Sequence, residues 1–293
     1  MSKSKEKVDV DSMRHSCAHV LAQAVLEMFP EAKLGIGPTI ENGFYYDFEL
    51  PRTLIPEDLP LLEKKMKQIV KQKQKFVRVE EPGDKSIEML KAAKQPYKVE
   101  LAEELVADGQ DITFYENIRP QGEKLMFVDL CAGPHVEHTG QIGPFKLMKI
   151  AGAYWKGDEK NTVLQRIYGT CWHSREELDA HLKQIEEAKK RDHRLIGKQQ
   201  GLFTMSPLVG AGYPMFLPKG TVLKDVLAEY ITDLKKRHGY KFVCIPHVAK
   251  EELYIKSGHM GKYDAMMPVM ETADGERYVM KAMNCPHHFE LFN

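Results

Sequence analysis

A long, highly charged segment after residue 174 divides this chain of 293 residues into two parts. Ser174 and Glu177 have the spacing of a helix capping box, and the sequence that follows predicts one helix over 174–200. Its apolar positions are too sparse to cover a core, so we expect this helix to link two bodies. The length of the chain suffices for two domains, which we place at 1–194 and 201–293.

The part before this helix combines helical and strand patterns. Helical patterns occur at 12–28, 57–75, 86–95 and 99–107, and strand patterns at 112–116, 124–130, 145–155 and 162–172. Ser12 stands where it can cap the first helix, and Pro30 ends it. Glycines and prolines between 35 and 48 predict a strand, a turn and a second strand. Together these patterns predict an α+β fold.

The part after residue 200 has a different composition, beginning with a stretch rich in Gly and Pro. A helix is predicted at 221–238, with a broad apolar face made by Val222, Leu223, Val226, Leu227, Tyr230, Ile231 and Leu234. Strands are predicted at 241–246 and from Arg277 onward. Because the sequence stops shortly after, we expect this second domain to be incomplete.

Composition is typical of a soluble globular protein, with 43% hydrophobic and 29% charged residues. Lys+Arg and Asp+Glu both number 42, so the overall charge indicates no polyanionic partner. The lysines crowded into 64–75 are better explained as a solvated helix face than as a surface near RNA phosphates. The chain opens without a signal peptide, has no bilayer-length apolar run and carries five widely spaced cysteines. We therefore expect a cytoplasmic protein with free or metal-binding thiols.

Two short motifs carry residue types that suit chemistry. His15 and His19 are four positions apart on a predicted helix, so their imidazoles share one face. Cys131 and His135 flank a Gly-Pro turn, and Asp129 stands two positions earlier. The set offers zinc ligand types, but it also suits general acid–base work on a water, and each residue alone is more often a packing residue.

Five segments in order resemble the bacterial threonyl-tRNA synthetase family, from about residue 12 to the end: MRHSCAHVLAQAV, IGPTIENGFYYDF, VDLCAGPHV, FKLMKIAGAYWKGDEKNTVLQRIYGTCW and KAMNCPHH. The resemblance implies an editing domain at 1–194 that contains the second additional domain motif near 122–172. It also implies that 201–293 is the start of a class II antiparallel-sheet catalytic domain, whose first motif at 221–246 builds a homodimer.

The chain also departs from the family pattern. The resemblance begins after the position of the family's N-terminal ubiquitin-like domain, and we expect the second and third class II motifs and the anticodon-binding domain to lie beyond Asn293. We therefore expect ligase activity to be absent from this chain. Ala132 stands where many relatives carry Arg, which removes a charge beside the editing motif.

The implied reactions are ligation of threonine to its tRNA and hydrolysis of mischarged seryl-tRNA. The resemblance assigns editing to His15, His19, Asp129, Cys131 and His135, with Tyr46 contacting substrate. His15 would accept the proton of the attacking water, at a site that we expect to be metal-free. Cys285 would be the first of three zinc ligands of the synthetic site, and the full-length enzyme would use ATP and Mg²⁺. Threonine, ATP and the tRNA for threonine are the implied partners, with no membrane and no DNA.

Two other hypotheses about the function remain. One is a free-standing, alanyl-type deacylase that depends on zinc, since alanyl enzymes share the HxxxH and CxxxH pattern. The segment 200–293 argues against it, because such a deacylase needs no class II catalytic start. The other is a non-catalytic remnant that binds tRNA or dimerises. A deacylation assay separates the remnant from both enzymes, and zinc content separates the two enzymes.

Overall fold

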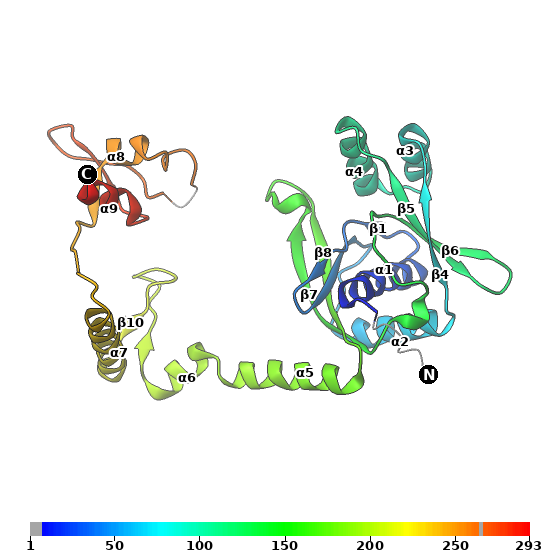
Figure 1. Cartoon of the computed structure of the whole chain (residues 1–293), viewed down its shortest axis with the longest axis horizontal. Coiled ribbons are helices and arrows are strands. Elements are labelled where there is room, and N and C mark those ends of the chain that lie inside the picture. The colour runs from blue at the N-terminus through cyan, green and yellow to red at the C-terminus, as the bar shows by residue number, and fades with distance from the viewer. Residues whose placement is uncertain (1–7, 264–265) are drawn as a thin grey trace. The chain divides into compact units, whose positions relative to one another are not determined.

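The computed structural model describes residues 8–263 and 266–293, which form two compact units with their boundary in the sequence between Arg191 and Asp192 (Figure 1). The predicted helix over 174–200 is broken at this point into α5 (Arg175–Lys190) and α6 (His193–Gln200). The break has a local cause, because the Asp192 side chain accepts a hydrogen bond from the backbone N–H of Arg194 and so starts a new helix. Ser174 and Glu177 begin α5 as the capping pattern predicts.

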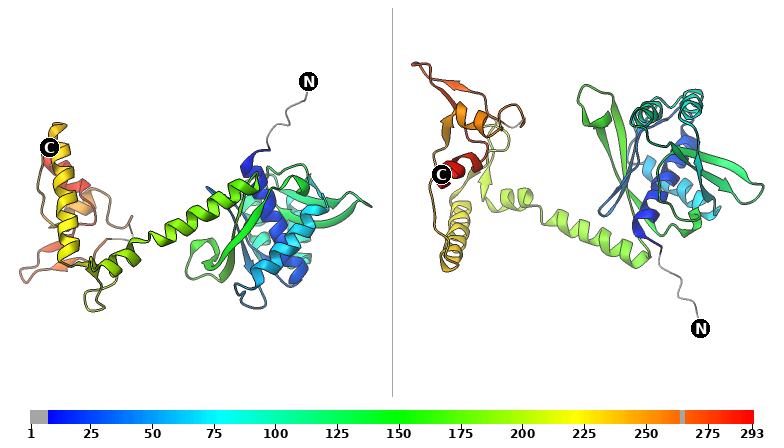
Figure 2. Two further views of the ribbon diagram at one scale, coloured as in Figure 1. Left: turned by 90° about the horizontal axis from the view of Figure 1, so that it is seen from below. Right: turned by 45° about the horizontal axis from the view of Figure 1, so that its top comes forward.

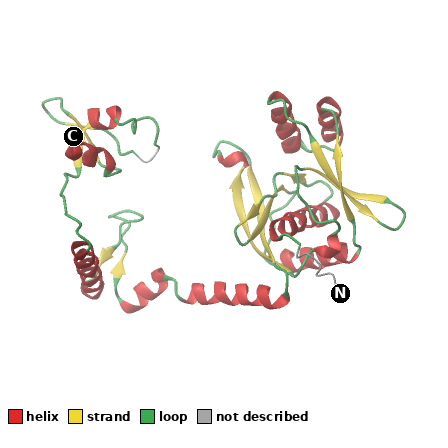
Figure 3. Cartoon of the chain, viewed as in Figure 1, coloured by secondary structure: helices red, strands yellow, loops and turns green. Residues whose placement is uncertain are grey.

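The first unit contains two antiparallel sheets. The larger sheet has the order β1-β3-β8-β7, with β2 also paired to β3; its strands are β1 (Lys33–Leu34), β2 (Thr39–Ile40), β3 (Gly43–Glu49), β7 (Phe145–Tyr154) and β8 (Val163–Cys171). The smaller sheet has the order β4-β5-β6; its strands are β4 (Lys75–Glu80), β5 (Thr113–Arg119) and β6 (Lys124–Leu130). Strands and helices thus mix along the chain, which confirms the α+β prediction (Figure 3).

Helix α1 (Val10–Met28) is the centre of the first unit. It packs against β3, β8, β6 and α2 (Asp58–Lys71), and Figure 2 shows it in dark blue from two further sides. Its N-cap is Asp9 rather than the predicted Ser12, because the Asp9 carboxylate accepts the backbone N–H of Ser12. Alternate residues of β3, among them Phe44, Tyr46 and Phe48, are buried in the same core as α1.

Two further helices pack on the smaller sheet. α3 (Gly83–Ala92) and α4 (Pro96–Ala107) contact each other and share a small core with β5. Pro96 opens α4 at its first position, where a missing N–H leaves no helix bond unmade. α4 also contacts β1, and this contact brings its first turn to the edge of the larger sheet. Short 3₁₀ turns occupy Thr139–Gln141 and Trp155–Gly157.

The second unit is built from short elements. Its remaining helices are α7 (Pro218–Arg237), α8 (Glu251–Lys256) and α9 (Cys285–Phe292), and its strands are β9 (Phe203–Thr204), β10 (Met215–Phe216), β11 (Val248–Lys250), β12 (Met270–Glu271) and β13 (Arg277–Met280). β9 pairs with β10, and β13 lies between β11 and β12. The predicted strand at 241–246 is wrong, because this apolar segment forms no strand in the described residues.

The apolar face predicted for α7 is present, and in the described residues it is exposed: Val222, for example, is 63% exposed and Tyr230 also 63%. No helix in the described ranges is both long enough and apolar enough to cross a lipid bilayer.

Candidate active site

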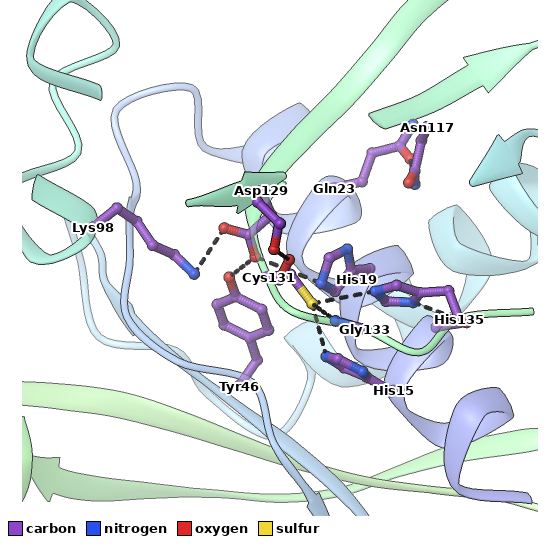
Figure 4. A network of polar contacts seen from close by, with 12 residues as sticks. His15, His19, Gln23, Tyr46, Lys98, Asn117, Asp129, Cys131, Gly133 and His135 are labelled. Atoms are coloured by element: carbon purple, nitrogen blue, oxygen red, sulfur yellow. Dashed lines mark hydrogen bonds and ion pairs between the residues drawn. The ribbon is translucent and has the colours of Figure 1, made fainter. Parts of the chain in front are cut away.

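Four side chains from two separate parts of the sequence meet in the first unit. They are His15 and His19 of α1 and, after β6, Cys131 and His135 (Figure 4). Their ligand atoms all lie within 4.8 Å of one another. The prediction that the two motifs share one site is therefore confirmed in its geometry.

Helix α1 and the Gly-Pro turn both position these groups. The i, i+4 spacing puts His15 and His19 on one helix face, and their rings lie edge to face with centroids 5.3 Å apart. Gly133 has φ of +78°, and a Cβ there would lie 2.5 Å from the hydroxyl of Tyr115. Glycine is needed at this position for both reasons. The turn places the backbone nitrogen of Gly133 3.2 Å from Sγ of Cys131, and the Gly133 N–H donates a hydrogen bond to this sulfur.

Cys131 lies between two imidazoles. Its Sγ is 3.3 Å from Nε2 of His15 and 3.3 Å from Nε2 of His135. The other ring nitrogen of each histidine is also fixed. Nδ1 of His15 donates to the carbonyl oxygen of Pro134 at 3.2 Å, and Nδ1 of His135 lies 3.0 Å from Ser16 Oγ. Both rings therefore turn Nε2 toward the sulfur.

A buried charge pair forms the adjoining wall. Lys98 Nζ lies 2.7 Å from Oδ1 of Asp129, and both side chains are almost fully buried. Tyr46 donates its hydroxyl hydrogen to Oδ2 of the same carboxylate. The imidazole nearest to Asp129 is His19, whose Nε2 lies 3.8 Å from Oδ2, beyond hydrogen-bond distance. Asp129 therefore lies beside the imidazoles, but His15 is oriented by Pro134.

Burial sets the protonation of the cluster. Burial lowers the pKa of His15. It lowers the pKa values of His19 and His135 well below the usual value, and repulsion between the protonated rings lowers these two further. All three rings are thus neutral near pH 7. Burial also raises the pKa of Cys131 to about 11, so its sulfur carries a proton in the absence of a cation. Burial and Asp129 together raise the pKa of Tyr46 well above its usual value.

An open cavity of about 480 Å³ gives access to these groups. Its walls come from α1, the 36–39 segment, β3, α4 and the 129–134 segment, including His15, His19, Tyr46, Lys98, Asp129 and Cys131. This size is in the range of small-ligand sites. The cavity can therefore hold a small ligand beside the His15 ring, which is neutral near pH 7.

The site contains residues that sequence reasoning missed. Lys98 supplies a buried cation, and Ser16 and Pro134 orient the two imidazoles that face Cys131. Nothing in the helical pattern of 96–107 distinguishes Lys98 from a solvent-exposed lysine. Cys285, the predicted zinc ligand, lies in the second unit, exposed at the start of α9. Among the described residues it belongs to no group of three possible ligands.

Comparison with known proteins gives a consistent result. Residues 112–168 match the family model described as the threonyl and alanyl tRNA synthetase second additional domain. The chain is 48% identical to the threonine–tRNA ligase of Gloeobacter violaceus, over 96% of this chain and 44% of the relative. It is 46% identical to that of Dehalococcoides mccartyi, over 100% of this chain and 48% of the relative.

The chain is homologous to a portion of threonine–tRNA ligase. The Streptococcus mutans threonine–tRNA ligase is also 46% identical, over 97% of this chain and 42% of the relative. The chain thus spans slightly less than half the length of the curated threonine–tRNA ligases that it matches. Asp129, Cys131 and His135 lie inside the segment matched by the second additional domain, whereas His15, His19 and Tyr46 lie outside it.

Proposed function

We propose that the first unit hydrolyses the aminoacyl ester of seryl-tRNA for threonine, as the editing part of a threonine–tRNA ligase. The observation that carries this proposal is the ring of His15, which lines the open cavity and is held by the Pro134 carbonyl. A neutral imidazole in this position can act as a general base near neutral pH. The homology to threonine–tRNA ligases supports the choice of an aminoacyl ester as substrate.

The reaction requires one water and one base. Nε2 of His15 takes a proton from the water as its oxygen bonds to the ester carbonyl carbon. The bond between that carbon and the ribose oxygen then breaks, and the ribose oxygen takes the proton from His15. Serine and a free tRNA end are the products. No other proton donor or acceptor is required.

The charge pair beside the base suits substrate recognition. The hydroxyl of Tyr46 and the ammonium of Lys98 both bind the Asp129 carboxylate, and all three groups line the cavity. A carboxylate at this wall can bind the ammonium of the aminoacyl group, and its partners hold it in place. Cys131 and His135 would then position the terminal ribose.

Selection of serine over threonine explains why such a site is useful. In the synthetic site, serine differs from threonine by one missing methyl group. The lost contact is worth only about 1–3 kcal/mol, so the synthetic site alone cannot exclude serine well enough. A second site that excludes the methyl group by size corrects the error. We therefore propose that the cavity admits the seryl ester and excludes the threonyl ester.

The second unit contributes, in this proposal, to ligation of threonine in the longer enzyme. In that enzyme, ATP and threonine would be the substrates and Mg²⁺ a cofactor. Cys285 would be one ligand of a zinc ion. The exposed apolar face of α7 supports a role in a homodimer, because a face of this breadth is stable in water only when covered. Analytical ultracentrifugation of the chain with Tyr230→Lys tests it: a dimer that the substitution dissociates is expected.

The editing proposal is tested by following deacylation of two esters of the same tRNA. The purified chain, treated with a chelator, should hydrolyse the seryl ester and leave the threonyl ester largely intact. If neither ester is cleaved faster than in buffer, the chain is a binding remnant and the proposal fails. Equal cleavage of both esters would likewise exclude an editing role.

A further inference from the structure

A line of polar side chains continues along helix α1 beyond the cavity (Figure 4). His19, Gln23 and Glu27 follow one another at four-residue spacing, so they lie on one face of the helix. His19 and Gln23 are buried, whereas Glu27 is partly exposed and pairs with Lys65 at 3.0 Å. Asn117 of β5 is fully buried and joins this line from the smaller sheet. Buried polar groups of this kind require hydrogen-bond partners, so each one can be accounted for.

The direction of the hydrogen bonds in this line is fixed at its outer end. The Glu27 carboxylate can only accept, so the side-chain NH₂ of Gln23 donates to it, at 3.1 Å. The side-chain oxygen of Gln23 therefore faces Asn117, whose NH₂ donates to it, also at 3.1 Å. This leaves the side-chain oxygen of Asn117 as an acceptor. It is buried and has no hydrogen-bond partner among the described residues.

The hydrogen on the His19 ring is placed by Asp129. Nε2 of His19 lies 3.8 Å from Oδ2 of Asp129, which is too far for a hydrogen bond but close enough for electrostatic attraction. The carboxylate attracts an N–H and repels a nitrogen lone pair, so the hydrogen of the neutral ring belongs on Nε2. Nδ1 is then an acceptor. It too is buried and unpaired within residues 8–263 and 266–293.

The two unpaired acceptors lie in one region between α1 and the smaller sheet. Asn117 is the direct strand partner of Phe76 and of Phe127, so these three side chains share one face of the sheet. The rings of Phe76 and Phe127 both pack on His19, with centroids 6.3 and 5.9 Å from its ring. Two acceptors cannot bond to each other, whereas one water molecule has two hydrogens and can donate to both.

We propose that a buried water joins Nδ1 of His19 to the side-chain oxygen of Asn117, and that Asn117 is thereby a positioning residue for the hydrolysis proposed above. The water holds the His19 ring with its Nε2–H toward Asp129. That N–H stabilises the carboxylate that binds the ammonium of the aminoacyl group in the proposed function. The water and the ring orientation stand on the contacts of the described residues, whereas the effect on hydrolysis rests on the proposed function.

The ring orientation is tested by NMR of the full chain labelled with ¹⁵N-histidine and treated with a chelator. His19→Gln assigns the His19 signals. The parent chain should carry the hydrogen of His19 on Nε2, and the ring C–H beside Nδ1 should give a cross peak to a bound water. Asn117→Leu has a similar shape but no acceptor, so it should remove this cross peak and raise the fraction of rings with hydrogen on Nδ1. A parent chain with hydrogen on Nδ1, or without the water cross peak, would overturn the proposal.

Hydrolysis of the seryl ester gives a second measurement. In Asn117→Leu the seryl-tRNA concentration at half-maximal rate should rise by up to about tenfold, the value of one hydrogen bond. The maximal rate should change less, because the carboxylate binds the ammonium equally before and during the reaction. Gln165→Leu is the matched control. It removes a partly buried amide that bonds to Leu54 and Arg52, and residue 165 is not among those that line the cavity, so both values should stay at those of the parent.

The possible failures are distinguishable. An unchanged half-maximal concentration in folded Asn117→Leu would overturn the positioning role, even where the water cross peak disappears. A parent chain that cleaves neither ester defeats the proposed function alone, because the NMR spectra still decide the water. If circular dichroism shows that Asn117→Leu is unfolded, Gln23→Met takes its place: it releases the Asn117 amide and should give a mixture of the two neutral forms of His19. A single, unchanged form in folded Gln23→Met would overturn the fixed direction of the line.

Discussion

Lys98 of α4 and Asp129 of β6 form a buried ion pair, with 2.7 Å between Nζ and Oδ1. The Lys98 side chain is 4% exposed and the Asp129 side chain 3%. Removing one partner of such a pair leaves an uncompensated buried charge. We expect Lys98→Met to destabilise the first unit by about 3–5 kcal/mol. Urea unfolding followed by circular dichroism measures this change.

The matched control for this prediction is Lys156→Met, which removes a lysine paired with Glu100 and Glu104 at the surface. Exposed pairs contribute about 0–1 kcal/mol, so this variant should unfold almost like the parent chain. Adding Asp129→Asn to Lys98→Met should recover part of the loss, since the uncompensated charge is gone. Equal effects of the two single lysine substitutions would contradict the assignment of a buried pair.

His15→Ala removes the proposed general base. General-base help contributes about 10²–10⁴-fold, so hydrolysis of the seryl ester should slow by that factor. His181→Ala is the control, because this histidine packs on Trp172 and is not among the residues that line the cavity. Single-turnover rates and thermal unfolding should be measured for both. A full rate in folded His15→Ala would remove the base from the mechanism.

The hydrolysis should also depend on pH in a defined direction. Burial lowers the pKa of His15 below its usual value near 6.5, and the base acts only when deprotonated. The rate should therefore be level above pH 7 and fall in acid with a midpoint below 6.5. A midpoint above 7 in a pH–rate profile would point to a different group.

Stability should fall in the same acidic window. The folded chain keeps His19 and His135 neutral, because burial lowers their pKa values, whereas the unfolded chain protonates both below about pH 6.5. The unfolded state thus binds more protons, and stability drops as pH falls below 6.5 by up to about 1.4 kcal/mol per unit for each ring. Urea midpoints between pH 6.5 and 5.5 give the slope. His135→Gln should reduce it by about half.

Gly133→Ala tests the turn that positions Cys131. Gly133 and Gly122 have φ of +78° and +81°, so alanine is strained at both, by about 1 kcal/mol. A Cβ at 133 would also lie 2.5 Å from the Tyr115 hydroxyl, whereas at 122 nothing lies within 4 Å. Gly133→Ala should therefore impair hydrolysis, and Gly122→Ala should affect only stability. Similar activity losses in both variants would show that the contact with Tyr115 is unimportant.

Local sequence determined most of the helices and strands of the first unit. The strand predicted at 124–130 matches β6, because its run of apolar residues lies between a turn at Gly122 and the Gly-Pro turn at 133–134. The pairing of His15 with His19 could also be predicted, since helix geometry alone puts positions i and i+4 on one face. In contrast, the apolar segment 241–246 carries a strand pattern but forms no strand, since a strand also requires a partner.

Only the tertiary structure decided which groups surround the candidate site. Lys98 reaches Asp129 because α4 packs on the smaller sheet, to which β6 belongs, a contact between segments that no periodic pattern encodes. The orientation of His135 likewise depends on Ser16, 119 positions away. The Ser16 hydroxyl donates its hydrogen to the carbonyl oxygen of Ser12 and so accepts from His135. Periodicity reports which face of an element is buried, but it does not report the element against which that face packs. The sequence by itself therefore determined the reactive residue types, whereas the fold decided their charges, ring orientations and partners.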